Sequence, residues 1–109
     1  MSLFFPGPDE KSRHTIFPGV EISTSACKEM MLSHVVMAPL AVVAPHQHPH
    51  EQVGIVLKGR AVFRIGAEEK ELGPSDMYRI PSQVTHQVRA LAEGAEALDI
   101  FHPIREDYL

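Results

Sequence analysis

The sequence predicts an all-β protein that folds as one jelly-roll barrel. Short runs of apolar and β-branched residues alternate with turn residues along nearly the whole chain, which is typical of a sandwich or barrel. No stretch of a dozen residues shows a clean helical period. A chain of 109 residues buries roughly 65% of its unfolded surface, which is enough for one core. Closure is favoured over an open sheet because it removes strand edges that would pair with other chains.

The expected strands follow from alternating apolar positions between turn residues. They cover residues 15–22 (interrupted by Pro18-Gly19), 30–37, 41–44, 53–57, 60–65, 68–72, 77–80, 85–91 and 95–101. Residues 60–65 and 68–72 flank Gly66-Ala67, which predicts a hairpin. Further turns are expected at residues 73–76 and at Glu93-Gly94.

The domain prediction is a single unit over residues 1–109. Within it we expect an irregular N-terminal segment at residues 1–13 and a barrel core at residues 34–102. Pro103 ends the last strand, and residues 104–109 are expected to form a helical turn.

Composition excludes several classes of function. The net charge is −4 with neutral histidines and there is no basic stripe, so nucleic acid is not an expected partner. The single Cys27 rules out an intramolecular disulfide framework and fits a reducing compartment. No apolar run is long enough to cross a bilayer, and the first residues lack the pattern of a signal peptide. We therefore expect a soluble, cytoplasmic protein without a membrane partner.

The run His46-Gln47-His48-Pro49-His50-Glu51-Gln52 predicts most of a metal site. Residues two apart on a strand share a face, so His46, His48 and Gln52 can point the same way. Imidazole suits Zn, Fe, Ni and Cu. His86, which follows a turn and opens a strand, is the best candidate for a further ligand. We expect one divalent transition-metal ion, without a choice among Ni, Zn, Mn and Fe.

Two neighbouring histidines and one glutamate have other interpretations. Strict alternation points Glu51 to the opposite face, although Pro49 can disturb that alternation and leave Glu51 as a ligand. His50 shares the parity of the ligands but follows Pro49, so a ligand role stays open. His34 lies mid-strand among apolar residues, and a hydrogen-bonded core position is favoured over a place lining the pocket.

The C-terminal stretch ALDIFHPIREDYL holds the second candidate group. Asp99 and Phe101 share a face of the last strand, and a buried Asp needs partners. Asp99 and Arg105 can form a salt bridge that pins the tail. Alternatively, Asp99 acts as general acid or base and Arg105 binds a carboxylate with its planar fork.

The runs HQHPHEQVGIVLKG and SDMYRIPSQVTHQVRA resemble the two conserved motifs of the cupin superfamily, which implies a cupin jelly roll. Carried over by position, the family's metal ligands fall on His46, His48, Gln52 and His86. The chain departs from the family in having Gln52 where Glu is usual. The loss of that carboxylate removes the two-His-one-carboxylate set of iron oxygenases and favours Lewis-acid chemistry.

Residues from about His34 to Leu109 resemble the small pectin-degradation cupins of the KdgF-like group, in which a Gln completes the metal set. The resemblance implies an enzyme that converts ring-form 4,5-unsaturated uronates from pectin or alginate into linear keto sugars. It implies catalytic roles for Asp99 and Arg105, substrate contacts from Phe101 and Arg105, and a homodimer. His102 replaces a commoner small residue, with no assigned role. The alternatives are another cupin enzyme, such as a dioxygenase or isomerase, or a non-catalytic metal- or sugar-binding cupin.

Overall fold

In the computed structural model, which describes residues 2–109, eight strands form an antiparallel jelly roll. The strands are β1 (Ser12–Phe17), β2 (Val20–Ala26), β3 (Met31–Met37), β4 (Val42–His46), β5 (Glu51–Ile65), β6 (Glu68–Leu72), β7 (Met77–Ile80) and β8 (His86–His102). Two short 3₁₀ turns, η1 (Pro8–Glu10) and η2 (Glu106–Tyr108), lie near the ends of the chain. The predicted all-β jelly-roll class is confirmed.

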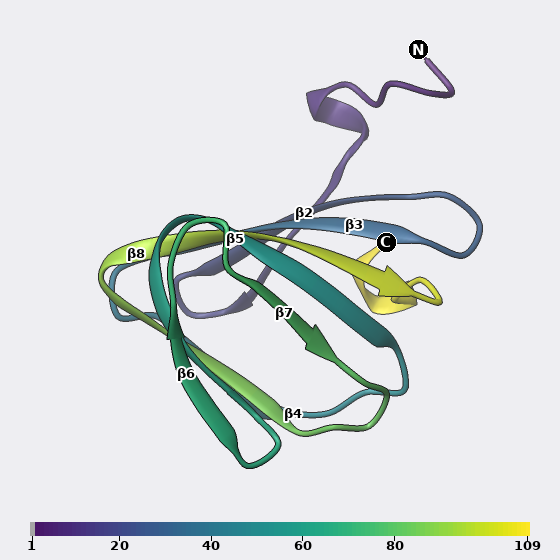
Figure 1. Ribbon diagram of the computed structural model, residues 1–109. Helices are drawn as coiled ribbons and strands as arrows, with labels where there is room; N and C mark the ends of the chain where they lie inside the picture. Colours follow the sequence, from purple (N-terminus) through teal and green to yellow (C-terminus); the bar gives the residue numbers. More distant parts are fainter. Residues whose placement is uncertain (1) are drawn as a thin grey trace.

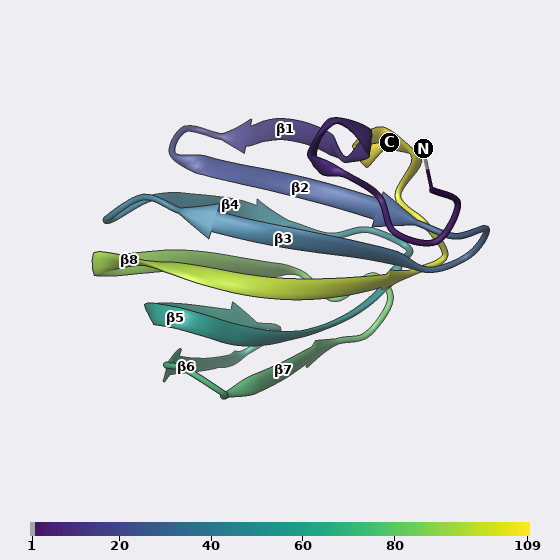
Figure 2. The same cartoon turned by 90° about the horizontal axis from the view of Figure 1, so that it is seen from above.

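The two longest strands, β5 and β8, pair with each other along most of their length and run through both layers of the barrel (Figure 1). In one layer the order is β1-β2-β3-β8-β5-β7, which Figure 2 shows in succession. In the other layer the first half of β8 pairs with β4, and the second half of β5 pairs with β6. The core lies between the layers.

The sequence divides β5 and β8 into two strands each, and this prediction is wrong. Gly59 and Gly94 both adopt positive φ angles, +70° and +76°, a region that favours glycine. A Cβ on Gly59 would overlap the carbonyl oxygen of Gly94. The register of β5 shifts on both sides of Lys58-Gly59. The two glycines therefore bend paired strands from one layer into the other, where the sequence predicted a break at Gly59 and a turn at Glu93-Gly94.

The predicted strand at residues 15–22 is a hairpin in the structure. Phe17 pairs with Val20 across Pro18-Gly19, and Gly19 has a φ of +75°. The strands predicted at residues 68–72 and 77–80 have the predicted bounds, and η2 confirms the helical turn expected in the tail. In the N-terminal segment Met1 lies outside the described residues, and β1 already begins at Ser12.

Alternation along β3 decides which side chains reach the core. Met31, Ser33, Val35 and Met37 are buried, whereas His34 faces outward and its Nε2 donates a 2.9 Å hydrogen bond to the Glu96 carboxylate. His34 is therefore neither a core residue nor part of the pocket, because its strand parity places it on the outer face. Within residues 2–109 no helix has the length and apolar character needed to cross a membrane.

Candidate metal centre and its cavity

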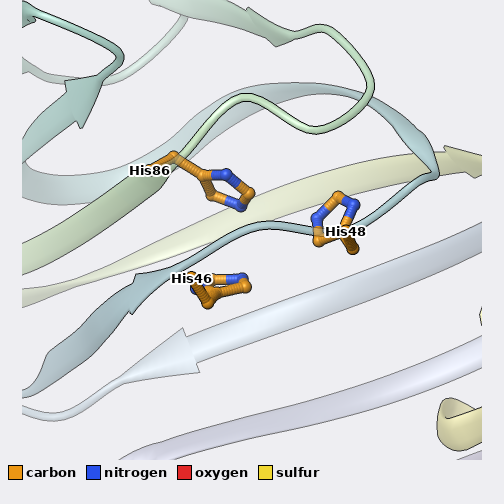
Figure 3. Close-up of side chains that lie close together, drawn as sticks. All are labelled: His46, His48 and His86. Carbon is orange, nitrogen blue, oxygen red and sulfur yellow. The ribbon is translucent and has the colours of Figure 1, made fainter.

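Three histidines from two parts of the chain meet inside the barrel (Figure 3). β4 ends at His46, which pairs in register with His86 at the start of β8. Their ring centroids lie 4.2 Å apart, and the His48 ring lies 4.9 Å from that of His86. One ring nitrogen from each lies within 4.8 Å of the others. His48 lies past the end of β4, so the loop, and not strand alternation, turns its side chain inward.

The hydrogen bonds of the three rings identify which nitrogens face one another. Each Nδ1 lies close to a backbone carbonyl oxygen: 2.9 Å from Ala44 for His46, 3.0 Å from His50 for His48, and 2.9 Å from Val84 for His86. A carbonyl only accepts, so each Nδ1 carries the proton and each Nε2 keeps a lone pair. A backbone carbonyl on the outer nitrogen is the usual support for a metal-binding histidine.

Burial favours the neutral form of two of these rings, those of His48 and His86, and a neutral imidazole can bind a cation. Burial lowers the pKa of His86 to about 4 and also lowers that of His48. The Nε2 of His86 is buried and has no hydrogen-bond partner among the described residues. Such an orphaned acceptor is costly, and a metal ion bound by three imidazole lone pairs would satisfy it.

Gln52 adds an oxygen beside the histidines. It lies buried on β5, and its Oε1 is 3.1 Å from Nε2 of His48. Because that Nε2 keeps a lone pair, it and the Gln52 oxygen attract each other only when a cation lies between them. Gln52 is therefore suited to be the fourth ligand of a metal ion. Glu51 is exposed on the opposite face. His50 supplies its carbonyl oxygen to His48, but its ring lies outside the group of three.

Asp99 lies on β8 next to this cluster and is only 7% exposed. The hydroxyl of Tyr78 donates a hydrogen bond to its Oδ1. Burial raises the pKa of Asp99 to about 6, although the hydrogen bonds of Tyr78 and Gln52 and the charge of Arg105 act in the opposite direction. An amide at position 52 can therefore donate to Asp99 while its oxygen faces the histidines. A glutamate there would place a second negative charge beside a buried carboxylate.

Arg105 lies in the tail that crosses the end of the barrel. Its guanidinium carbon is 4.0 Å from the Tyr108 ring centroid and 5.4 Å from that of Phe101. Of the two interpretations of Asp99 and Arg105 that the sequence left open, the salt bridge between them does not form among residues 2–109, where Arg105 pairs with Asp107 (Nη2–Oδ2 2.9 Å). Arg105 and Asp107 are only two residues apart in the tail. The Asp99 carboxylate instead accepts a hydrogen bond from the Tyr78 hydroxyl.

Several of these side chains, though not His48, line one interior cavity of about 60 Å³. Its polar lining includes His46, Gln52, His86, Asp99, Arg105 and Tyr78. A water in the liquid takes about 30 Å³, so the enclosed space suits an ion with one or two waters, or the reacting edge of a larger molecule. His102 is more than half exposed and lies 3.9 Å from Glu29, away from the cavity.

Sequence reasoning did not select Tyr78 or Tyr108. Tyr78 shares its parity with buried Ile80 on β7, so the alternation of that short strand could have placed it inward. Its contact with Asp99 depends on the pairing of β7, β5 and β8. Tyr108 lies in the tail, where no periodic pattern predicts a direction.

Three imidazole lone pairs converge beside a buried carboxylate. The protein is therefore a jelly-roll barrel that could hold one transition-metal ion in its interior. The Cupin domain family matches residues 33–101. The chain belongs to the cupin family, as a small cupin of the KdgF-like group.

Individual relatives agree with this assignment. The pectin degradation protein KdgF of Dickeya dadantii (strain 3937) is 33% identical over 82 residues, which make up 74% of each chain. The structure of KdgF from Halomonas sp. matches with a TM-score of 0.85 and 30% identity, over 96% of this chain and 97% of that one. An RmlC-like cupin from Shewanella frigidimarina NCIMB 400 matches with a TM-score of 0.88 and 25% identity, over 99% and 97%.

A more distant match extends the fold beyond this group. Oxalate decarboxylase of Bacillus subtilis, a protein with Mn(II) centres, has a TM-score of 0.81 and 20% identity, over 91% of this chain and 29% of that one. At that identity the likeness shows the fold alone.

Proposed function

We propose that this protein binds one divalent transition-metal ion and converts ring-form 4,5-unsaturated uronates into linear keto sugars. The observation that carries the proposal is the convergence of three histidine lone pairs, two of them from His46 and His86, which line one cavity together with Asp99 and Arg105. The similarity to two KdgF proteins, one of them described as a pectin degradation protein, supports the substrate class.

His46, His48 and His86 would hold the ion, with the Gln52 oxygen as the fourth ligand. When bound, the ion supplies Lewis-acid polarisation of a substrate hydroxyl. Four neutral ligands would leave the charge of the ion uncompensated, unlike the two-His-one-carboxylate set of iron oxygenases. This ligand chemistry favours ring opening over oxygen activation.

Arg105 suits the carboxylate of a uronate. Its guanidinium can form two parallel hydrogen bonds to a carboxylate, and only 12% of its side chain is exposed. The neighbouring Phe101 ring offers an apolar surface to the sugar face. Because the cavity is about 60 Å³, the sugar would enter with its reacting edge only.

Asp99 suits proton transfer in this reaction. Ring opening breaks the bond between C1 and the ring oxygen, removes the proton of the C1 hydroxyl and delivers a proton to C4, so that the product is an isomer of the substrate. A pKa of about 6 lets one carboxyl both accept and donate near neutral pH. Burial, the main cause of that pKa, also excludes competing water.

The test is turnover of unsaturated galacturonate by protein loaded separately with Ni²⁺, Zn²⁺, Mn²⁺ or Fe²⁺. Loss of the ring-form signal is followed by proton NMR, beside an Asp99→Ala variant and a Glu69→Gln control on exposed β6. We expect acceleration by the wild type and the control and at least a hundredfold loss in Asp99→Ala. No acceleration with any of the four ions would refute the function.

The same samples decide between the alternatives. Oxygen consumption with substrate and Fe²⁺ would indicate a dioxygenase, and binding without turnover would indicate a sensor or carrier. The expected homodimer stays a prediction, which light scattering after size exclusion checks directly.

A further inference from the structure

A row of three residues crosses the sheet below the metal cluster. Gly54 on β5 pairs in register with Tyr78 on β7 and with Asp99 on β8. These three strands lie side by side (Figure 2). Residues that pair directly share a face of the sheet, so Tyr78 and Asp99 point into the barrel on either side of Gly54.

Gly54 is needed for the contact between its two neighbours. A Cβ at this position would overlap the Tyr78 hydroxyl, the adjacent ring carbon and Oδ1 of Asp99. Directly paired side chains two strands apart do not usually meet, because the middle side chain separates them. The missing side chain lets Tyr78 and Asp99 lean over the backbone of β5 and join in a hydrogen bond.

The aromatic ring of Tyr78 is held by packing in the core. Its ring packs against Phe63 with centroids 4.4 Å apart, and the residue is buried. Packing determines the ring orientation, and the hydroxyl has the Asp99 carboxylate as its side-chain partner. A rigid aromatic donor of this kind limits the rotamers of the carboxylate that accepts from it.

We propose that Tyr78 is a positioning residue for Asp99, and that Gly54 is the gap that lets it act. The Tyr78 hydroxyl holds Oδ1, so that the other carboxylate oxygen faces the cavity and the Gln52 amide. The catalytic consequence rests on the function proposed above. The geometric consequence, a single Asp99 rotamer, does not depend on the substrate.

The first measurement is the rotamer of Asp99 in metal-free, isotope-labelled protein. Three-bond couplings from its Cγ to the backbone nitrogen and carbonyl report χ1. We expect the values of one staggered rotamer in the wild type and averaged values in Tyr78→Phe, which keeps the packing against Phe63. Should Tyr78→Phe not fold, Gly54→Ala displaces the intact hydroxyl and is expected to average the same couplings.

The second measurement is turnover in a double-mutant cycle. Tyr78→Phe is expected to lower kcat about 10- to 100-fold with KM changed less than about twofold, because misplacement of a proton-transfer group acts on the chemical step. In an Asp99→Asn background Tyr78→Phe should have no further effect. A purely structural role would add its loss in both backgrounds.

Unchanged Asp99 couplings in the variant overturn the proposal, and so does a Tyr78→Phe loss that adds in full to that of Asp99→Asn. If the couplings average but the wild type shows no uronate turnover, the positioning of Asp99 stands and the proposed function fails. The two failures are therefore distinguishable.

Discussion

Replacement of Asp99 by Asn should stabilise the metal-free protein at neutral pH, by an amount that depends on pH. The folded protein raises the pKa of this carboxyl from 3.8 to about 6, chiefly by burial. The native state then binds the proton more tightly than the unfolded chain. The resulting stability is fully present below about pH 3.8 and is lost as the pH rises through about 6.

The magnitude follows from linkage. A pKa raised from 3.8 to about 6, at about 1.4 kcal/mol for each tenfold change in proton affinity, disfavours the ionised carboxyl in the native state by about 3 kcal/mol. Asn cannot ionise, and its carbonyl can still accept from the Tyr78 hydroxyl. The free energy of unfolding of Asp99→Asn should therefore exceed that of the wild type by about 3 kcal/mol at pH 8 and by less than about 1 kcal/mol at pH 4.

The difference between the two proteins isolates Asp99 from the histidines. The lowered pKa of His86, about 4, contributes stability that is present above about pH 6.5 and is lost as the pH falls towards 4. That contribution is common to both proteins and cancels in the difference. The assay is urea unfolding followed by circular dichroism between pH 4 and pH 8, with a chelator present.

Two results would refute the reasoning. A difference in unfolding free energy that does not change with pH would mean that Asp99 titrates alike in the folded and unfolded states. A less stable Asn variant at pH 8 would mean that the interactions of the charged carboxylate outweigh its burial. Metal-dependent activity should be lost in the same variant, which would make Asp99 a residue that costs stability for function.

Three further substitutions test the cavity. Ser33→Ala removes a buried hydroxyl that has no hydrogen-bond partner among the described side chains and backbone groups. The melting temperature should therefore stay the same or rise, while KM for the uronate increases. A large drop in melting temperature would contradict this prediction. Gln52→Glu should tighten metal binding in calorimetry by about tenfold yet lower kcat, because a second carboxylate disfavours ionised Asp99; equal or higher kcat would argue against it. Asp107→Asn frees Arg105 from an exposed partner, and should lower KM up to about fivefold at constant kcat, with no change for a neutral sugar.

The sequence was informative where side-chain chemistry repeats at short range. Alternation and turn residues placed the strands at residues 68–72 and 77–80 with the observed bounds. The histidine run and the first residue of β8 indicated that His46, His48 and His86 could share one site, and the structure brings them together. Such patterns are local, and local geometry determines which side chains share a face.

Prediction failed where a long-range contact changed the meaning of a local pattern. Gly59 and Gly94 bend two long strands because they lie against each other, although each glycine alone resembles a break. His34 lies among apolar residues in the sequence, but its strand parity places it outside. His48 reaches the site from a loop, because β4 ends two residues earlier.

The sequence by itself determined the fold class and the three histidines that could bind a metal ion, since both depend on residue type and spacing. Only the tertiary structure decided how the buried carboxyl group of Asp99 is held. It joins Asp99 to Tyr78 across Gly54 and leaves Arg105 paired with Asp107. The physical reason is register: which residues face each other across three strands depends on the pairing of the whole sheet, and no segment carries that information alone.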